Sequence, residues 1–392
     1  MFLDMTLKRN PELIKSSVRF HREGKITPNS YILDVDAIEM NASKLADKAK
    51  EHNIELYMMT KQMGRNPELA KIIANSGIKK AVAVDPWEAL TLAEAGINLG
   101  NVGHLVQIPS NMIKKILSYN PEVITVFTVE KAKEISKAAL ELGMKQDIIL
   151  RVVGPDDMIY DGQIGGFKES ELIEKAREIN LFDGVNIVGV TAFPCFLYDS
   201  EVGKVKKTNN VYTAMRCIEK LKEELNIEVK QINTPSTNMI SSIPILEELG
   251  STHGEPGHAL TGTTPLHGHE ILEEIPAMVY VSEISHIFDD KAYVYGGGYY
   301  RRSHVKKAMV GRDFESMKTN MMQAEEISPE SIDYYGTLIM GDKKAEVGDT
   351  VIYSFRTQIF VTRSEVVLVR GIQTGNPKII GIYDSLGRLL RR

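Results

Sequence analysis

The chain has 392 residues, more than one hydrophobic core usually supports, so we expect two domains or one large barrel with an added module. Its 47 basic and 52 acidic side chains are spread along the chain and give a net charge of −5, which does not indicate a nucleic-acid-binding protein. Two cysteines, Cys195 and Cys217, indicate a reducing compartment, so we expect a cytoplasmic protein with no exported or membrane-spanning segment.

From residue 30 onward, short apolar or β-branched runs alternate with helical patterns, several of which end at glycine or asparagine. The runs cover 30–37, 54–60, 80–85, 102–108, 122–128, 147–153, 186–193, 228–234 and, less regularly, 251–262. Eight such β/α units in one series favour a closed (β/α)8 barrel of the TIM type over an open, doubly wound sheet. We expect this barrel, with an N-terminal extension, to span residues 1–275.

Past residue 276 the pattern changes to closely spaced strand candidates separated by turn residues, with little helical periodicity between them. The sequence therefore predicts a C-terminal all-β domain over residues 276–392.

In a (β/α) barrel the loops that follow the strands open onto one face, and catalytic side chains come from several strand ends. Lys61 follows the second apolar run, residues 235–238 follow the eighth, and residues 254–258 interrupt the last. We expect these three segments to converge on one rim.

Lys61 stands in "YMMTKQMGRNPELA", where an apolar run meets the start of a helix. Gly64 suits a tight turn, Asn66 is a good N-cap and Pro67 suits the first helical position, so a short loop would hold the lysine at the rim. An isolated lysine at a strand end is more often a solvated side chain. A partly buried one has a lowered pKa, and its neutral amine can form a Schiff base with an aldehyde.

Two further segments offer ligand contacts. Ser236, Thr237 and Asn238 supply hydroxyl and amide donors for an anion, although such residues are also ordinary helix N-caps. Glu255 lies between Gly254 and Gly257, which allow close approach of the backbone to a ligand. A buried carboxylate needs a cationic or N–H partner, such as a protonated pyridine nitrogen; the alternative is a solvated glutamate in a surface turn.

These motifs resemble the fold-type III pyridoxal-phosphate enzymes, which include alanine racemase, D-threonine aldolase and amino-acid decarboxylases, and are nearest the YhfX-type group of racemase-like proteins. The "TKQMGRNPELA" segment is similar to the family's cofactor-lysine segment. "GEPGHAL" is similar to the decarboxylases' Glu-Pro-Gly-Arg motif, with His258 in place of the arginine. The resemblance implies pyridoxal 5'-phosphate as the cofactor, an amino acid as the substrate and a homodimer with its active site at the interface.

By this resemblance Lys61 is the catalytic residue and holds the cofactor, and Glu255 contacts the ring nitrogen. Ser236, Thr237 and Asn238, with Gly257 and His258, are expected at the phosphate. Arg151, at the end of a strand, is expected to contact a substrate carboxylate or a cofactor oxygen, although a structural salt bridge fits its position equally well.

The chain also departs from the family. Phe193 stands where alanine racemases have a histidine, and no residue is assigned as the second acid or base, for which Tyr299, Tyr334 and Tyr335 are the candidates. We expect no metal, although the four histidines of the segment after residue 250 could bind one; they are His253, His258, His267 and His269.

The expected activity is amino-acid racemisation. The alternatives are decarboxylation, aldol cleavage or dehydration on the same lysine, a non-catalytic cofactor-binding protein, and a metal-dependent hydrolase.

Overall fold

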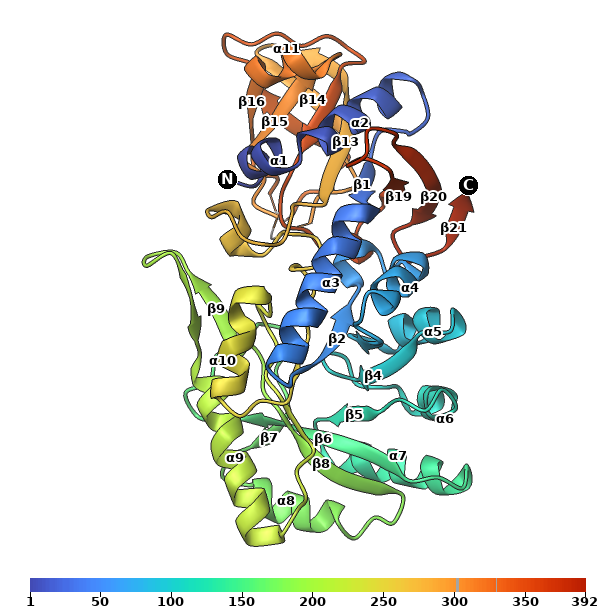
Figure 1. Ribbon diagram of the computed structural model, residues 1–392, viewed down its shortest axis with the longest axis vertical. Coiled ribbons are helices and arrows are strands. Elements are labelled where there is room, and N and C mark those ends of the chain that lie inside the picture. Colours follow the sequence, from blue (N-terminus) through green and yellow to red (C-terminus); the bar gives the residue numbers. More distant parts are fainter. Residues whose placement is uncertain (301–302, 329) are drawn as a thin grey trace. The chain divides into compact units, whose positions relative to one another are not determined.

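The computed structural model describes residues 1–300, 303–328 and 330–392, which form two compact units (Figure 1). Residues 42–60 and 70–257 make up one unit, here called the barrel unit. Residues 1–41, 61–69 and 258–392 make up the other, here called the sheet unit. The chain therefore crosses from the barrel unit to the sheet unit between Thr60 and Lys61, and again after Gly257.

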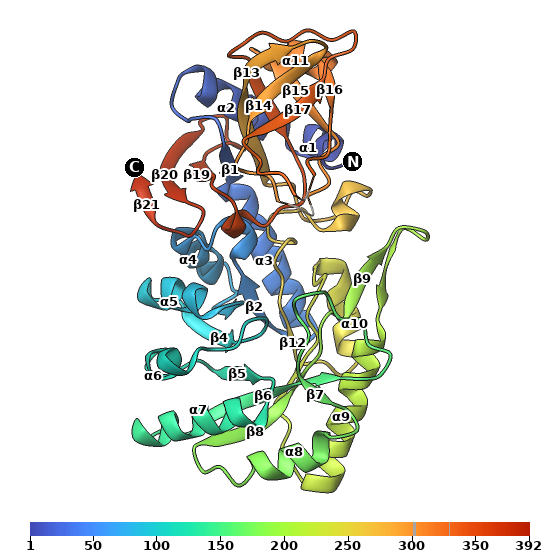
Figure 2. The same ribbon diagram turned by 180° about the vertical axis from the view of Figure 1, so that it is seen from behind.

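Eight parallel strands of the barrel unit lie side by side in the order β5-β4-β3-β2-β12-β11-β8-β6. They close into a barrel because β5 and β6, at the two ends of this order, also pair with each other. The strands are β2 (Glu55–Met59), β3 (Lys80–Ala83), β4 (Asn98–Val102), β5 (Val123–Val126), β6 (Gln146–Val153), β8 (Val185–Thr191), β11 (Gln231–Asn233) and β12 (His253–Gly254). The predicted barrel is confirmed. Its helices lie outside the strands (Figures 1 and 2), so the carboxyl ends of the strands present their loops together.

The helices follow the predicted alternation with strands. They are α1 (Phe2–Arg9), α2 (Pro11–Arg22), α3 (Val35–Glu51), α4 (Pro67–Asn75), α5 (Pro86–Glu94), α6 (Ile113–Leu117), α7 (Val129–Glu141), α8 (Leu172–Ile179), α9 (Asn209–Leu225), α10 (Ile243–Glu248) and α11 (Phe314–Thr319), with the 3-10 turns η1 (Lys61–Met63), η2 (Ser110–Met112), η3 (Ile240–Ser242), η4 (Pro265–Gly268) and η5 (Ile359–Val361). Among the described residues, no helix combines the length and apolar character needed to cross a membrane.

Two strand predictions were wrong. The run at 30–37 is not a barrel strand: β1 (Ser30–Asp34) lies in the sheet unit between β13 and β19, where all five of its residues are buried by these neighbours. The run at 102–108 is mostly a loop, because β4 ends at Val102 and Gly103 turns the chain with a φ of +86°. A Cβ at Gly103 would lie 2.9 Å from the Thr125 carbonyl oxygen, so the close approach requires glycine.

The sheet unit is built around a ten-stranded sheet with the order β14-β17-β16-β15-β18-β13-β1-β19-β20-β21. Its further strands are β13 (Met278–Phe288), β14 (Lys291–Tyr295), β15 (Lys307–Gly311), β16 (Met321–Ala324), β17 (Tyr335–Ile339), β18 (Thr350–Tyr353), β19 (Glu365–Arg370), β20 (Lys378–Asp384) and β21 (Leu389–Arg391). The short strands β7 (Phe167–Lys168), β9 (Phe196–Asp199) and β10 (Lys204–Lys207) belong to the barrel unit. Every strand after residue 276 has an antiparallel partner, and β19 also pairs parallel with β1.

The N-terminal extension contributes to the sheet unit's core. Helix α2 is capped by Asn10, whose side-chain oxygen accepts from the Leu13 amide at 3.2 Å, and it begins with a proline. Its buried stripe, including Leu13 and Ile14, packs in one cluster with Val279 of β13 and Ile352 of β18. The extension is therefore held by burial of apolar surface and not by the cap alone.

His21 on α2 makes stability depend on pH. Its Nδ1 lies 2.8 Å from the Thr350 hydroxyl, and a Glu283 carboxylate oxygen lies 3.3 Å from its Nε2. Burial outweighs that carboxylate and, with the Arg22 charge, lowers the pKa of His21 from 6.5 to about 4. The unfolded chain therefore binds a proton near pH 6.5 that the folded chain does not, so stability falls as the pH drops from 6.5 towards 4.

We expect His21→Gln to flatten the stability profile between pH 7 and pH 4.5, measured by urea unfolding at several pH values. The exposed His286 gives a matched control, His286→Gln, which should retain the wild-type slope. A wild-type slope in His21→Gln would show that other groups cause the loss of stability in acid.

Candidate active site

Glu255 directly follows β12, the last barrel strand, and is buried. Its Oε1 accepts hydrogen bonds from the side-chain amides of Asn101 (3.0 Å) on β4 and Asn233 (2.6 Å) on β11. Two amide donors on one buried oxygen offset part of the cost of removing a carboxylate from water. The predicted surface-turn alternative for Glu255 is therefore wrong, and the carboxylate lies inside the barrel.

The backbone on both sides of Glu255 is also fixed. Its amide donates to Oδ1 of Asn238 at 2.7 Å, and the Pro256 carbonyl accepts from the Met59 amide on β2 at 3.0 Å. Asn238 and Glu255, which follow different strands, are thus brought together as predicted. The Asn238 side chain therefore fixes the backbone of the turn at Glu255.

His104 is a site residue that the sequence reasoning missed, because the prediction placed it within a strand. It is fully buried, its Nε2 lies 3.4 Å from Oε2 of Glu255, and its ring meets Phe193 edge-on with centroids 5.3 Å apart. The Phe193 ring therefore packs against the imidazole of His104. The available signal was Gly103, a turn residue directly before His104 near the start of the run at 102–108.

Arg151 on β6 is 1% exposed, and its guanidinium carbon lies 4.8 Å from the centre of the Phe127 ring. In register, Arg151 lies opposite Thr191 of β8, which lies opposite Asn233 of β11, so the three form one row across the barrel wall. None of the three guanidinium nitrogens has a hydrogen-bond partner among the described residues. Burial lowers the pKa of Arg151 to about 10, which still leaves it charged at neutral pH.

A buried guanidinium without partners among the described residues is costly, and an anionic group is the kind of partner that would offset this cost. The alternative that Arg151 forms a structural salt bridge has no support among the described residues, where no carboxylate pairs with it.

We expect Arg151→Met to stabilise the ligand-free protein by about 1–3 kcal/mol, because it removes an unpaired buried charge while keeping an apolar chain of similar length. The same change should remove binding of the anionic ligand. Urea unfolding measures the first effect, and Arg216→Met serves as a control, since Arg216 is exposed and paired with Glu169. A destabilised Arg151→Met would contradict the assignment of Arg151 as a ligand contact.

The loop at 235–238 is bound to the protein through its hydroxyls. Ser236 and Thr237 both donate to the Phe196 carbonyl, at 2.7 and 3.2 Å, and both have positive φ angles, of 96° and 51°. Such angles are unusual for residues other than glycine and mark a backbone that the fold holds in place. To donate to a phosphate, these hydroxyls must turn away from Phe196.

Lys61 begins η1 in the sheet unit and is half-buried. The predicted helix start is confirmed: the Asn66 side-chain oxygen accepts from the amides of Glu68 and Leu69, both at 3.1 Å. Gly64 has a φ of +70°, and a Cβ there would lie within 3.2 Å of Ile359 and Val366 side chains.

The C-terminal segment η5 thus packs closely on the lysine turn. The Arg65 guanidinium also lies over the Phe360 ring, 4.7 Å from its centre. The position of Lys61 is therefore set by residues about 300 positions later in the same chain.

His258 also belongs to the sheet unit. Its Nδ1 lies 3.0 Å from the Thr263 hydroxyl and its Nε2 lies 3.2 Å from Nε2 of Gln358. Gly257 before it is half-buried at a bend. The predicted residues therefore form two groups, Lys61 with His258 in the sheet unit and the others in the barrel unit; their convergence on one site remains a prediction.

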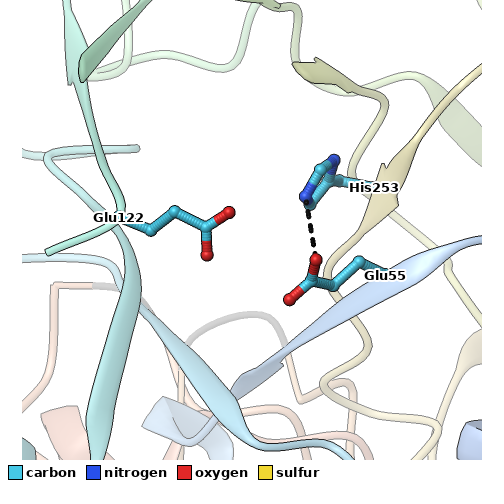
Figure 3. A group of neighbouring side chains, drawn as sticks. All are labelled: Glu55, Glu122 and His253. Carbon is cyan, nitrogen blue, oxygen red and sulfur yellow. Dashed lines mark ion pairs between the residues drawn. The ribbon is translucent and has the colours of Figure 1, made fainter. Parts of the chain in front are cut away.

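The histidines considered for a metal do not form a recognisable site in the described part of the chain. His253 lies with Glu55 and Glu122 (Figure 3), and their ligand atoms are within 4.8 Å of one another. The Lys80 ammonium forms ion pairs with the carboxylates of Glu55, at 2.5 Å, and of Glu122, so a lysine side chain supplies the positive charge at this group. Glu55, Lys80 and His253 are the first residues of their strands, at the opposite end of the barrel from Glu255.

The three tyrosines considered as a second acid or base differ in exposure. Tyr299 is half-buried beside Tyr353, and burial of its hydroxyl raises its pKa well above the usual value. Tyr334 and Tyr335 are 67% and 43% exposed. Nothing in the described residues assigns one of them to the site.

Comparisons with known proteins give the family context. The model of the alanine racemase N-terminal domain matches residues 33–265, and that of the YhfX-like C-terminal domain matches residues 279–379. The chain is 43% identical over 390 residues to the uncharacterized protein YhfX of Escherichia coli (strain K12), covering 100% of both chains. It is 25% identical over 213 residues to an alanine racemase of Clostridium perfringens, covering 54% of this chain and 53% of that protein.

Solved structures are similar in fold. An alanine racemase from Clostridium difficile 630 in complex with cycloserine gives a TM-score of 0.65 at 18% identity, over 92% of this chain and 99% of that one. D-threonine aldolase from Filomicrobium marinum gives 0.64 at 15% identity, over 92% and 95%. D-threo-3-hydroxyaspartate dehydratase from Delftia sp. HT23 gives 0.64 at 14% identity, over 90% and 96%.

Proposed function

Because the chain belongs to the family with an alanine racemase N-terminal domain, here followed by a YhfX-like C-terminal domain, we propose that it is a pyridoxal-phosphate-dependent enzyme acting at Cα of an amino acid. Amino-acid racemisation is the proposed reaction. The observation that carries the proposal is that one barrel buries both a carboxylate, Glu255, and a guanidinium without a partner, Arg151. A zwitterionic cofactor and an amino-acid substrate supply the opposite charges that these two groups need.

The residues fit the cofactor in their chemistry. When bound, pyridoxal phosphate supplies an electron sink for the bond broken at Cα. Glu255 would keep the ring nitrogen protonated, because two amides hold its carboxylate in the barrel. Lys61 would attach the cofactor through its amine. Arg151 would bind a substrate carboxylate or a cofactor oxygen.

The phosphate would be held by Ser236, Thr237 and Asn238 of the 235–238 loop. The backbone near Gly257 and the His258 side chain would add further contacts to it. Because Asn238 already holds the Glu255 amide, phosphate binding and the orientation of Glu255 would depend on one side chain.

For racemisation, one group removes the Cα proton from one face and a second returns a proton to the other. The half-buried Lys61 amine is proposed as the group on one face. The second group is unassigned, and in a homodimer with the site at the interface it would come from the partner chain. We propose such a homodimer in the cytoplasm.

Decarboxylation, aldol cleavage and dehydration use the same lysine and glutamate, and the aldolase and dehydratase among the similar structures keep these reactions as the second candidate. A non-catalytic cofactor-binding protein is less favoured, because the chain has a C-terminal β domain, and residues of that domain pack on the lysine turn.

The test is a screen of L- and D-amino acids with the cofactor-loaded protein in deuterated water. Deuterium at Cα with formation of both enantiomers is the result expected for a racemase. Release of carbon dioxide, an aldehyde or ammonia identifies one of the other reactions. A colourless protein that hydrolyses substrates only with an added metal ion would overturn the proposal.

A further inference from the structure

Gln358, in the C-terminal segment that packs on the lysine turn, has an unusual environment. Its side chain is 8% exposed, and its Nε2 lies 3.2 Å from Nε2 of His258. Its amide oxygen has no hydrogen-bond partner among the described residues. The backbone beside it is fixed, since the Thr357 hydroxyl lies 2.9 Å from the hydroxyl of Tyr31 and the Thr362 amide closes η5 on Ile359.

The hydrogen bonds around His258 have a consistent direction. The Thr261 hydroxyl donates to the His258 carbonyl at 3.3 Å, so it can accept from the Thr263 hydroxyl 2.8 Å away. The Thr263 hydroxyl, having donated to Thr261, accepts from Nδ1 of His258 at 3.0 Å. This direction of the hydrogen bonds favours the tautomer of His258 that has its proton on Nδ1 and a lone pair on Nε2.

The amide nitrogen of Gln358 can only donate, so it matches that lone pair. Were the amide turned round, its oxygen would face the lone pair of Nε2, and the two acceptors would repel. The threonine pair and the Gln358 amide thus favour the same histidine tautomer from the two sides of the ring, and the amide oxygen of Gln358 is left buried and without a donor among the described residues.

We propose that Gln358 is a positioning residue of the Lys61 site: it holds His258 as a neutral imidazole protonated on Nδ1, and its amide oxygen accepts a hydrogen bond from a donor group of the bound amino acid. The hydrogen bond to the bound amino acid, but not the positioning of His258, rests on the proposed function. The C-terminal domain of the same chain then contributes directly to ligand binding, and His258 contributes no positive charge, unlike an arginine at that position.

The first experiment is NMR of the ¹⁵N-histidine-labelled full-length protein without added cofactor, with His258 assigned from the signals missing in His258→Gln. In the wild type we expect the tautomer protonated on Nδ1. Gln358→Glu places an acceptor at Nε2 and should move the proton to that nitrogen. Gln358→Leu should give a mixture of both tautomers, whereas Gln323→Leu, at an exposed glutamine of the same unit, should leave the signals unchanged.

The second experiment titrates the cofactor-loaded wild type and Gln358→Leu with each amino acid that exchanges its Cα proton in the screen above. We expect the apparent KM to rise roughly tenfold, the effect of one lost hydrogen bond, while the visible band recorded without amino acid stays unchanged. An unchanged KM overturns the ligand contact. A wild-type His258 protonated on Nε2, or a tautomer that neither substitution alters, overturns the positioning role. If no amino acid exchanges, the proposed function fails and the NMR result alone decides the inference.

Discussion

Lys61→Ala is expected to abolish the visible absorption band of the cofactor-loaded protein and to lower turnover at least about 1000-fold. The reason is that alanine has no amine to attach the cofactor aldehyde or to accept a proton from Cα. Lys61→Arg should fail equally, because a guanidinium keeps the positive charge but is neither nucleophilic nor a base at neutral pH. The measurements are the absorption spectrum after dialysis and the rate of Cα proton exchange.

Lys71→Ala is the matched control for Lys61, since Lys71 is an exposed lysine on α4, the helix that follows the same turn. Its spectrum and rate should equal those of the wild type. Thermal unfolding of Lys61→Ala should also be close to the wild type, because a half-buried side chain in a 3-10 turn contributes little to the core. A Lys61→Ala protein that keeps both its band and its activity would refute the assignment of this lysine.

Glu255→Gln is expected to lower kcat for Cα proton exchange about 100-fold or more with little loss of stability. Glutamine has nearly the same shape, and its oxygen can still accept from Asn101 and Asn233, so the turn should keep its geometry. The change removes only the negative charge that would keep the cofactor ring nitrogen protonated. The effect should therefore appear in kcat and in the absorption spectrum more than in the free energy of unfolding.

Glu55→Gln provides the control for Glu255, because Glu55 is a partly exposed carboxylate at the other end of the barrel, where it pairs with Lys80. Loss of that exposed ion pair should cost at most about 1 kcal/mol and leave kcat unchanged. A Glu255→Gln protein that turns over at the wild-type rate would contradict the prediction, because it would show that the cofactor ring accepts electrons equally well without this carboxylate.

Local sequence patterns were sufficient where a structure depends on neighbouring residues. The turn after Lys61 is one example: Gly64 has the expected positive φ, and Asn66 caps α4 as its residue type predicts. The alternation of apolar runs with helical patterns also predicted the closed barrel, and the motif resemblance predicted the family, which the match over residues 33–265 confirms. The barrel prediction depends on short-range periodicity, which a single chain displays directly, whereas the family prediction depends on the resemblance of its motifs to those of known enzymes.

Pairing between distant segments was decided by the tertiary structure. The run at 30–34 is as apolar as a barrel strand, and only its partners β13 and β19 place it in the sheet unit. Asn101 reaches Glu255 from within β4, and His104 reaches it because β4 ends at Val102 and Gly103 turns the chain. Gln358 lies beside His258 at the start of η5, the segment that packs on the lysine turn.

The sequence by itself therefore determined the barrel, and Lys61 and Glu255 as candidates, because residue type and local spacing carry that information; the family followed from the resemblance of its motifs. The partners of Glu255, the absence of a partner for Arg151 among the described residues, and the Gln358–His258 contact were decided by the tertiary structure. Hydrogen bonds act over about 3 Å, so whether a buried polar group is satisfied depends on which distant residues the fold brings beside it.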